Sequence, residues 1–140
     1  MPGPGKKRSS GCPVAFALDT FGDRWSLLIM RDLMVARLET YSELLAADER
    51  IATNVLADRL AALEAAGLID KSRDPDNHRR FIYRVTDKGC NLLPIIMEMV
   101  RWSGKYDPKT IAPRHILERL ENDRDGLIAD LKARLAIVKD

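Results

Sequence analysis

The part of this sequence that most constrains its fold is the stretch from Thr40 to Gly89. Its hydrophobic pattern predicts a short helix, a turn, a second helix and then two strands joined by a charged tip. This order is that of a winged helix-turn-helix, in which the second helix enters the major groove of DNA. The predicted fold is therefore mainly α-helical, with a small β-hairpin as the wing.

Local signals set the bounds of these elements. Thr40 followed three residues later by Glu43 is a capping-box pattern, and it begins the first short helix. The second helix has a leucine face and ends at Gly67, which supplies a left-handed residue; the face comprises Leu56, Leu60 and Leu63. The strands are predicted in "LIDKSR" and "RFIYRVT", with "DPDNH" as the turn-rich tip between them.

Helices are also predicted on both sides of this stretch. Pro13 begins one that Gly22 ends, and Asp23 caps the next, "DRWSLLIMRDLMVAR". A long helix is expected from about 88 to 106. Its apolar residues cover most of its circumference, more than one small domain can bury, which predicts a partner subunit. A second copy of the chain would pack through the N-terminal and C-terminal helices.

The chain divides by composition into three parts. Residues 1–11 form a Gly/Pro/Ser-rich flexible tail, residues 12–107 the winged helix-turn-helix and dimerisation domain, and residues 108–140 a C-terminal helical extension. In the extension an amphipathic helix is expected from about 114 to 138, a range that includes Val138, with Gly126 as a candidate kink.

The whole-chain numbers set broad bounds on function. The 140 residues suit one domain, and the formal net charge of +2 means that a nucleic-acid surface must come from local clustering of charge. No run of eighteen apolar residues and no secretory signal is found, so membrane insertion is not expected. Two cysteines fit a reducing cytoplasm. Metal-ligand spacings, phosphate loops and nucleophile elbows are absent, so no cofactor and no catalysis are expected.

The side chains best placed to bind double-stranded DNA lie on three elements. Thr53 and Asn54 start the second helix, where base edges are read, and Asn can bond adenine in two places. Arg59 lies further along that helix, facing a phosphate, a guanine or simply the neighbouring acid. The first helix offers N–H groups near Ser42 to a phosphate. In the hairpin, three basic side chains would follow the DNA backbone or enter the minor groove: His78, Arg79 and Arg80.

The two cysteines have different surroundings. Cys12 directly precedes Pro13, at the expected N-cap of the first helix, where the helix dipole favours a thiolate. Lys6, Lys7 and Arg8 lie close in sequence. These conditions suit an oxidant or electrophile sensor, and they suit a half-buried structural cap equally well. Cys90 lies among apolar residues and is predicted to be packed and inert.

Three segments together resemble the HxlR-type bacterial transcriptional regulators, which are related to the MarR group. They are "GCPVAFALDTFGDRWSLLIMRDL", "YSELLAADERIATNVLADRLAALEAAGLIDK" and "YRVTDKGCNLLPIIMEMVRW", from about Cys12 to Trp102. The resemblance implies a homodimer on a pseudo-palindromic operator, joined through the first and fifth helices. It also implies a recognition helix that starts near Ala52, a wing at Asp74–Arg80, and in some members a sensing cysteine that matches Cys12.

The chain departs from the family pattern in two places. Ala52 stands where the family often has Ser, and Asn54 where it often has a basic residue, so the bases that are contacted do not transfer. The segment after Pro108 exceeds the usual family length.

The function expected from the sequence is sequence-specific DNA binding by a homodimeric regulator, with repression favoured over activation. A redox- or electrophile-sensing regulator switched at Cys12 is the first alternative, with an oxidant or a small molecule as effector. A protein-interaction adaptor that uses the C-terminal helix is the second, and an enzyme comes last.

Overall fold

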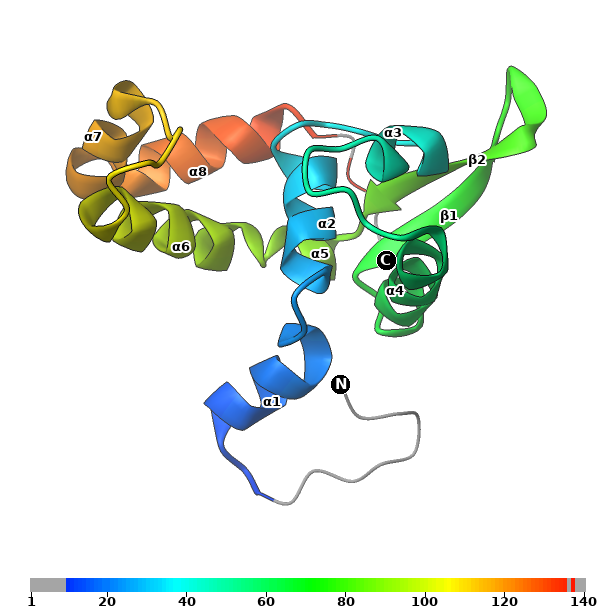
Figure 1. Cartoon of the computed structure of the whole chain (residues 1–140), viewed down its shortest axis with the longest axis horizontal. Helices are drawn as coiled ribbons and strands as arrows, with labels where there is room; N and C mark the ends of the chain where they lie inside the picture. The colour runs from blue at the N-terminus through cyan, green and yellow to red at the C-terminus, as the bar shows by residue number, and fades with distance from the viewer. Residues whose placement is uncertain (1–9, 136, 138–140) are drawn as a thin grey trace.

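The computed structural model describes residues 10–135 and 137. It contains two strands and eight helices within these residues (Figure 1). In chain order they are α1 (Pro13–Phe21), α2 (Ser26–Met34), α3 (Tyr41–Leu45), α4 (Thr53–Ala65), β1 (Ile69–Asp74), β2 (Asn77–Val85), α5 (Asp87–Cys90), α6 (Leu93–Tyr106), α7 (Arg114–Asn122) and α8 (Arg124–Ala133). The expected tail up to residue 9 and Val138 lie outside the described residues.

The N-terminal helix has the predicted bounds. Cys12 is its N-cap and Pro13 its first residue, where the missing N–H of proline removes no hydrogen bond. Gly22 ends the helix and donates its N–H to the Leu18 carbonyl at 2.8 Å. None of its residues is buried, and Figure 1 shows α1 projecting from the body of the molecule.

Asp23 is predicted from the sequence to cap α2, but the N-cap is Trp25, and Asp23 instead organises the turn that leads into the helix. Its carboxylate accepts hydrogen bonds from the N–H groups of Trp25 and Ser26, both at 3.0 Å. The helix itself begins at Ser26, after a turn through Arg24 and Trp25. One carboxylate thus satisfies two N–H groups that would otherwise lack partners at the helix start.

The capping box at Thr40 forms as expected. The Thr40 hydroxyl accepts the Glu43 N–H at 3.3 Å, and the Glu43 carboxylate accepts the Thr40 N–H at 3.1 Å. The leucine face of α4 is buried, and Gly67 has a φ of 77°, the left-handed conformation that ends a helix.

The two strands form an antiparallel hairpin. Ile69 pairs with Val85, and the register shifts between Arg73 and Asp74, so that Asp74 pairs with Asn77. The strands therefore continue into the segment predicted as the tip, and only Pro75 and Asp76 remain as the turn. At the base, Thr40 forms an isolated bridge with Ile82, and the Tyr83 N–H donates to the Glu39 carbonyl at 2.7 Å.

One hydrophobic core joins α2, α4, the base of the hairpin and α6. Met30, Leu56, Leu63 and Leu93 are fully buried at its centre. Burial of apolar area of this kind is the main force that holds the elements together. None of the helices in the described part of the chain is long and apolar enough to cross a membrane.

The expected helix from 88 to 106 is wrong as a single element. Thr86 caps the short α5, whose Gly89 N–H donates to the Thr86 hydroxyl at 3.1 Å, and the chain turns before α6. Pro94 explains the break. It has no N–H to continue the α5 hydrogen bonds, whereas it is well tolerated at the first positions of α6, where it lies.

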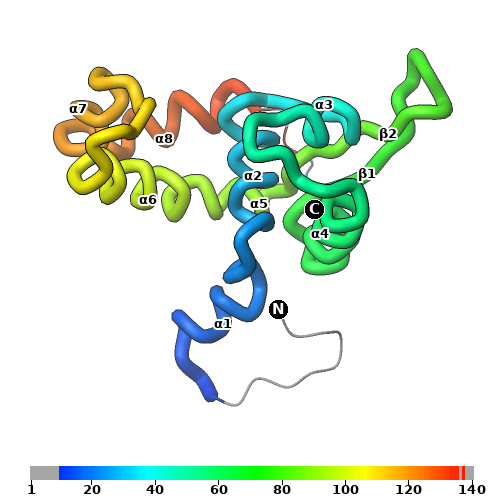
Figure 2. Tube along the Cα trace, in the orientation of Figure 1, coloured from blue at the N-terminus to red at the C-terminus, as the bar shows by residue number. Residues whose placement is uncertain are grey.

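The C-terminal helix is also two helices, and its break is not at Gly126. The chain turns at Asp123, which has φ −154° and ψ 49°, and Gly126 lies inside α8. Figure 2 shows the chain running out along α6, turning through α7 and returning along α8 toward α2. Leu120, Leu127 and Ile128 are buried in the common core. The apolar stripe that an adaptor would offer to another protein is thus largely covered within the chain.

Candidate nucleic-acid interface

The start of α4 presents its two predicted base-reading side chains to solvent. Thr53 and Asn54 are both exposed, and the N-cap residue Ala52 makes no side-chain cap. The hydroxyl of Tyr41 donates to the Thr53 carbonyl at 3.0 Å, which links α3 to the first turn of α4. This contact fixes the angle between the two helices at the end that would enter a groove.

The start of α3 is less open to phosphate than the sequence suggests. Ser42 is exposed, but its neighbour Glu43 places a carboxylate on the same turn. Hydrogen bonds from the N–H of Glu39, the Thr40 hydroxyl and the Thr40 N–H hold the pKa of Glu43 below its usual range. That carboxylate stays charged at neutral pH and opposes an approaching phosphate. The role of Ser42 in DNA binding stays a prediction.

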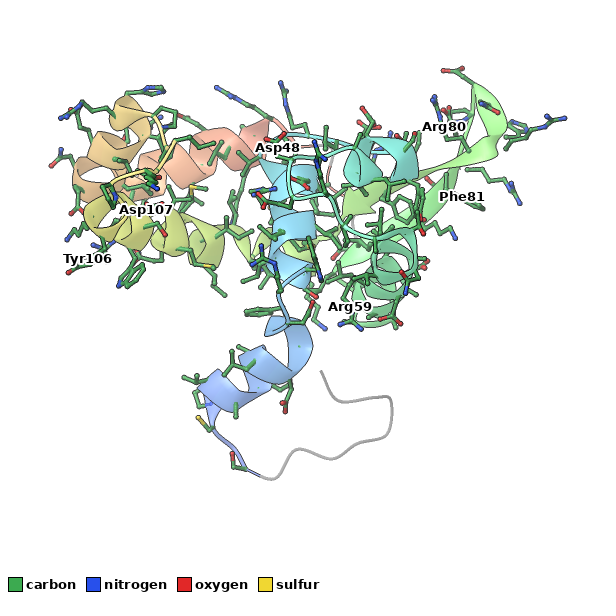
Figure 3. All side chains as sticks on the ribbon, in the orientation of Figure 1. Asp48, Arg59, Arg80, Phe81, Tyr106 and Asp107 are labelled. Atoms are coloured by element: carbon green, nitrogen blue, oxygen red, sulfur yellow. The ribbon has the colours of Figure 1, made fainter. Side chains whose placement is uncertain are left out.

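Arg59 is held by two carboxylates. Its guanidinium lies 2.6 Å from the Asp58 carboxylate and 3.4 Å from the Asp23 carboxylate, and its side chain is only 16% exposed (Figure 3). The pair with Asp58 is visible in the sequence, whereas the pair with Asp23 joins residues that are far apart in the chain. Arg59 therefore connects α4 to the turn before α2, and its contact with DNA stays a prediction.

Arg80 anchors the tip of the hairpin instead of extending freely from it. Its Nε and one terminal nitrogen lie 2.9 and 2.6 Å from one oxygen of Asp74, which is buried. The other Asp74 oxygen accepts the Asp76 N–H at 2.9 Å. One carboxylate thus accepts hydrogen bonds both from the Arg80 guanidinium and from the backbone of the turn. Both residues are visible in the sequence, but their pairing is not, because the bulge that brings them together is not apparent in the strand pattern.

Arg79 and His78 are exposed, as are the other basic side chains Lys71, Arg73 and Arg80 of the hairpin. The backbone N–H of Arg79 donates to the Asn77 side chain at 3.2 Å. Within the part of the chain that the structure describes, its guanidinium forms no ion pair. A cation held on a rigid hairpin without a protein partner is well suited to a phosphate.

The hairpin also carries two cations that lie over an aromatic ring. The ammonium group of Lys71 lies 4.2 Å from the centre of the Phe81 ring, and the guanidinium of Arg73 lies 4.8 Å from it. Arg73 also donates to the His78 carbonyl at 2.6 Å. These contacts orient the cations along the wing. No sequence motif distinguishes Phe81, whose place opposite Arg73 follows only from the strand register.

The cysteines differ as predicted in exposure. Cys12 is exposed at the N-cap of α1, whereas Cys90 is buried, and burial raises the pKa of its thiol. A search of the described residues finds no group of three His, Cys, Asp or Glu side chains that could hold a metal ion.

The helices α3 and α4 followed by a charged hairpin define a winged helix-turn-helix protein. The model of the HxlR-like helix-turn-helix family matches residues 20–111, and the chain belongs to this family. It is a transcriptional regulator of the HxlR- and MarR-like helix-turn-helix type.

Comparisons with individual proteins agree with this assignment. The chain is 33% identical over 109 residues to the uncharacterised HTH-type transcriptional regulator Rv3095 of Mycobacterium tuberculosis, and the match covers 76% of this chain and 66% of that protein. Among solved structures it is similar to PA1607, a proposed transcription factor, with a TM-score of 0.68, 33% identity and coverage of 76% and 74% of the two chains.

A second solved structure is the reduced form of the transcriptional regulator YodB from B. subtilis. It has a TM-score of 0.57 and 27% identity, and the match covers 72% of this chain and 99% of that one. YodB has also been solved in a quinone-bound form.

The pair of Asp74 and Arg80 generates a prediction about pH. Hydrogen bonds from the Asp76 N–H and then from the Arg80 guanidinium hold the pKa of Asp74 below its usual value, which is about 3.9. A carboxyl whose pKa is lowered by folding stabilises the fold above its unfolded pKa. That stabilisation is lost as the pH falls through the folded pKa. NMR titration of the Asp74 carboxyl carbon should therefore give a midpoint below the usual value.

Two variants separate the contributions to this shift. Arg80→Gln should raise the pKa of Asp74 only part of the way, because the larger contribution, from the Asp76 N–H, remains. Arg79→Gln removes an adjacent cation that has no contact with Asp74 and should leave the midpoint nearly unchanged. Equal midpoints in wild type and Arg80→Gln would contradict the pairing.

Proposed function

We propose that the chain acts as a homodimer on a pseudo-palindromic operator in double-stranded DNA and represses transcription there. The observation that carries the proposal is the combination of an exposed α4 start without a side-chain cap and a hairpin on which the Arg79 guanidinium forms no ion pair with the residues that the structure describes. Repression is the simplest consequence of a dimer that occupies promoter DNA.

The base contacts are assigned to Thr53 and Asn54. Both lie in the first turn of α4, the part of a recognition helix that reaches base edges. His78 and Arg79 follow the phosphate backbone or enter the minor groove. Arg80 supports them by holding the turn through Asp74, and its remaining exposed surface faces the same backbone.

Exposed apolar side chains on two helices support the dimer. On α1, Phe16 is 54% exposed and is flanked by the equally open Val14 and Leu18. On α6, Trp102 is 62% exposed, and the centre of its ring lies 5.2 Å from that of Tyr106, which is also exposed; the two rings are tilted by 47°. Apolar surface of this extent on two helices is unfavourable in water and is typical of a protein interface.

Arg79→Ala tests the wing role. The variant should bind all DNA sequences more weakly, because a phosphate contact carries no base information. Each lost contact lowers the slope of log affinity against log salt by about 0.9. A dimer loses two contacts, so the slope should fall by about 1.8. Fluorescence anisotropy across a salt series measures both quantities.

Arg114→Ala is the matched control for this experiment. Arg114 is an exposed arginine at the start of α7, on the side of the molecule away from the hairpin. Its removal should leave the slope unchanged. An unaltered slope in Arg79→Ala would exclude the wing role, and a fall of about 0.9 would indicate that one wing binds per complex.

Phe16→Glu tests the dimer. Burial of a Phe side chain is worth roughly 1.5–3 kcal/mol, and a two-fold axis places each substitution in the interface twice. The dimer dissociation constant should therefore rise at least roughly 100-fold. Analytical ultracentrifugation over a concentration series measures the constant.

Ile111→Glu provides the matched control. Ile111 is 94% exposed in the segment between α6 and α7, outside the helices assigned to the dimer. A monomeric wild type, or the same dissociation constant in both variants, would overturn the proposed interface.

A second function, redox or electrophile sensing at Cys12, is favoured by the exposure of this thiol. Cys12 is at the start of α1, next to the proposed dimer contacts of Val14 and Phe16. A group added to its sulfur would therefore alter the dimer geometry and so the spacing of the two recognition helices. The similarity to YodB, solved in reduced and quinone-bound forms, supports an oxidant or a quinone as effector.

Cys12→Ser tests this function. In reductant the variant should bind DNA as the wild type does. After treatment with diamide or a quinone, the DNA affinity of the wild type should change by roughly tenfold, a typical allosteric coupling, while the variant should not respond. Cys90→Ala, which removes the buried thiol, should respond like the wild type. A wild type without any response would eliminate the sensor role.

A further inference from the structure

A pocket of about 370 Å³ lies where the end of α2, the base of β2 and the segment after α8 meet. Its apolar lining comes from Leu33 of α2, Leu38 of the loop that follows α2, and Leu135 just after α8. Figure 1 shows the end of α8 returning to this position. The volume is within the range of sites for small organic ligands.

The polar lining of this pocket is strongly basic. Arg37, Arg84 and Arg134 reach it from three separate segments, and Glu39 is the only carboxylate among the described residues that line it. Three guanidinium groups against one carboxylate leave two net positive charges. Glu39 does not neutralise Arg84 closely, since the nearest oxygen and nitrogen are 3.8 Å apart, beyond hydrogen-bond distance. A concave basic surface with apolar walls attracts anions.

The arginines have unused hydrogen-bonding capacity. The Nε of Arg84 is buried, and no acceptor for it is found among the described residues. The side chains of Arg37 and Arg134 likewise form no ion pair within the described part of the chain. A buried donor without an acceptor is unfavourable, and a carboxylate offers two acceptors in the geometry of the guanidinium fork.

We propose that this pocket binds a small organic carboxylate with an apolar body. The carboxylate accepts hydrogen bonds from Arg84 and from Arg37 or Arg134, and the apolar body packs on the leucines. The family match ends at residue 111, so Arg134 and Leu135 lie beyond it. The site therefore depends on the C-terminal segment of this chain.

The pocket is connected to the wing. The Glu39 carbonyl accepts the Tyr83 N–H at 2.7 Å, and both residues line the pocket. Arg37 and Glu39 also line an adjacent hollow together with Ser42 and Arg80. On the proposed function, a bound anion lowers the positive potential beside these phosphate contacts and weakens DNA binding. By linkage, DNA weakens anion binding by the same factor.

The first experiment uses 2-naphthoate as the probe, titrated by calorimetry into the full chain without DNA. Saturable binding of one naphthoate per chain is expected. Two comparison compounds each lack one feature: the neutral 2-naphthamide lacks the charge, and inorganic phosphate lacks the apolar body. Each should bind at least about tenfold more weakly than naphthoate. Absence of saturable naphthoate binding, or equal affinity for either comparison compound, would overturn the proposal.

Two matched pairs of variants locate the site. Arg37 and Arg50 both have left-handed backbones, with φ of 57° and 54°, and Asn tolerates that conformation. Arg37→Asn should weaken naphthoate binding about tenfold, whereas Arg50→Asn, away from the pocket, should not. Arg134→Gln and Arg114→Gln form the second pair. Arg134→Gln should weaken naphthoate binding about tenfold, whereas Arg114→Gln should not. Equal losses within either pair would place the probe elsewhere and contradict the proposal.

A separate titration of DNA with and without naphthoate tests the linkage. Wild type should bind DNA more weakly in the presence of naphthoate, and Arg134→Gln should lose that effect. Because naphthoate binding is measured on the free protein, a failure to bind DNA would refute the proposed function and leave the anion site intact. An anion that binds without altering DNA affinity would refute the linkage.

Discussion

The short segment Glu39–Thr40 is the constraint on which the rest of the structure depends. On one side Thr40 caps α3 through the reciprocal bonds with Glu43. On the other side the segment pairs with β2, through the Glu39 carbonyl and the bridge from Thr40 to Ile82. The helix-turn-helix and the wing are thus attached to the same two residues. Their relative orientation is set by backbone hydrogen bonds at a buried position, not by flexible surface contacts.

The charges of the wing divide into two classes. Arg80 and Arg73 are held by contacts within the hairpin, and Arg84 lies in the basic pocket, so these cations shape the surface as well as charging it. Arg79 and His78 are the exposed groups that remain for a ligand. A count of basic residues therefore overstates the charge that the hairpin offers to DNA. It also leaves out the rigidity that the paired residues provide.

Much of the fold was predictable because its signals are local. The capping box at Thr40, the proline at the start of α1 and the left-handed Gly67 each act within a few residues, and all are confirmed. Contacts that join distant residues were not predictable. The pair of Arg59 with Asp23 requires α4 to lie beside the start of α2, and the pair of Arg80 with Asp74 requires the bulged register.

The two errors in helix length have different causes and consequences. The break before α6 follows from Pro94, a local signal that the broad apolar pattern of the segment outweighed. The break at Asp123 has no such signal, since a glycine three residues later is the more obvious candidate. Tertiary packing accounts for it: the turn lets both halves of the apolar stripe reach α6 and the core.

This turn also determines where the C-terminal segment ends. An unbroken helix over 114–138 would extend about 37 Å in one direction and would not turn back toward α2. With the turn at Asp123, α8 returns along the molecule and brings Arg134 and Leu135 beside Arg84 of β2. The basic pocket exists because of that return. A segment outside the family match thus contributes to a surface at the base of the wing. On the proposed function, a ligand at this surface lies beside the hairpin that contacts DNA.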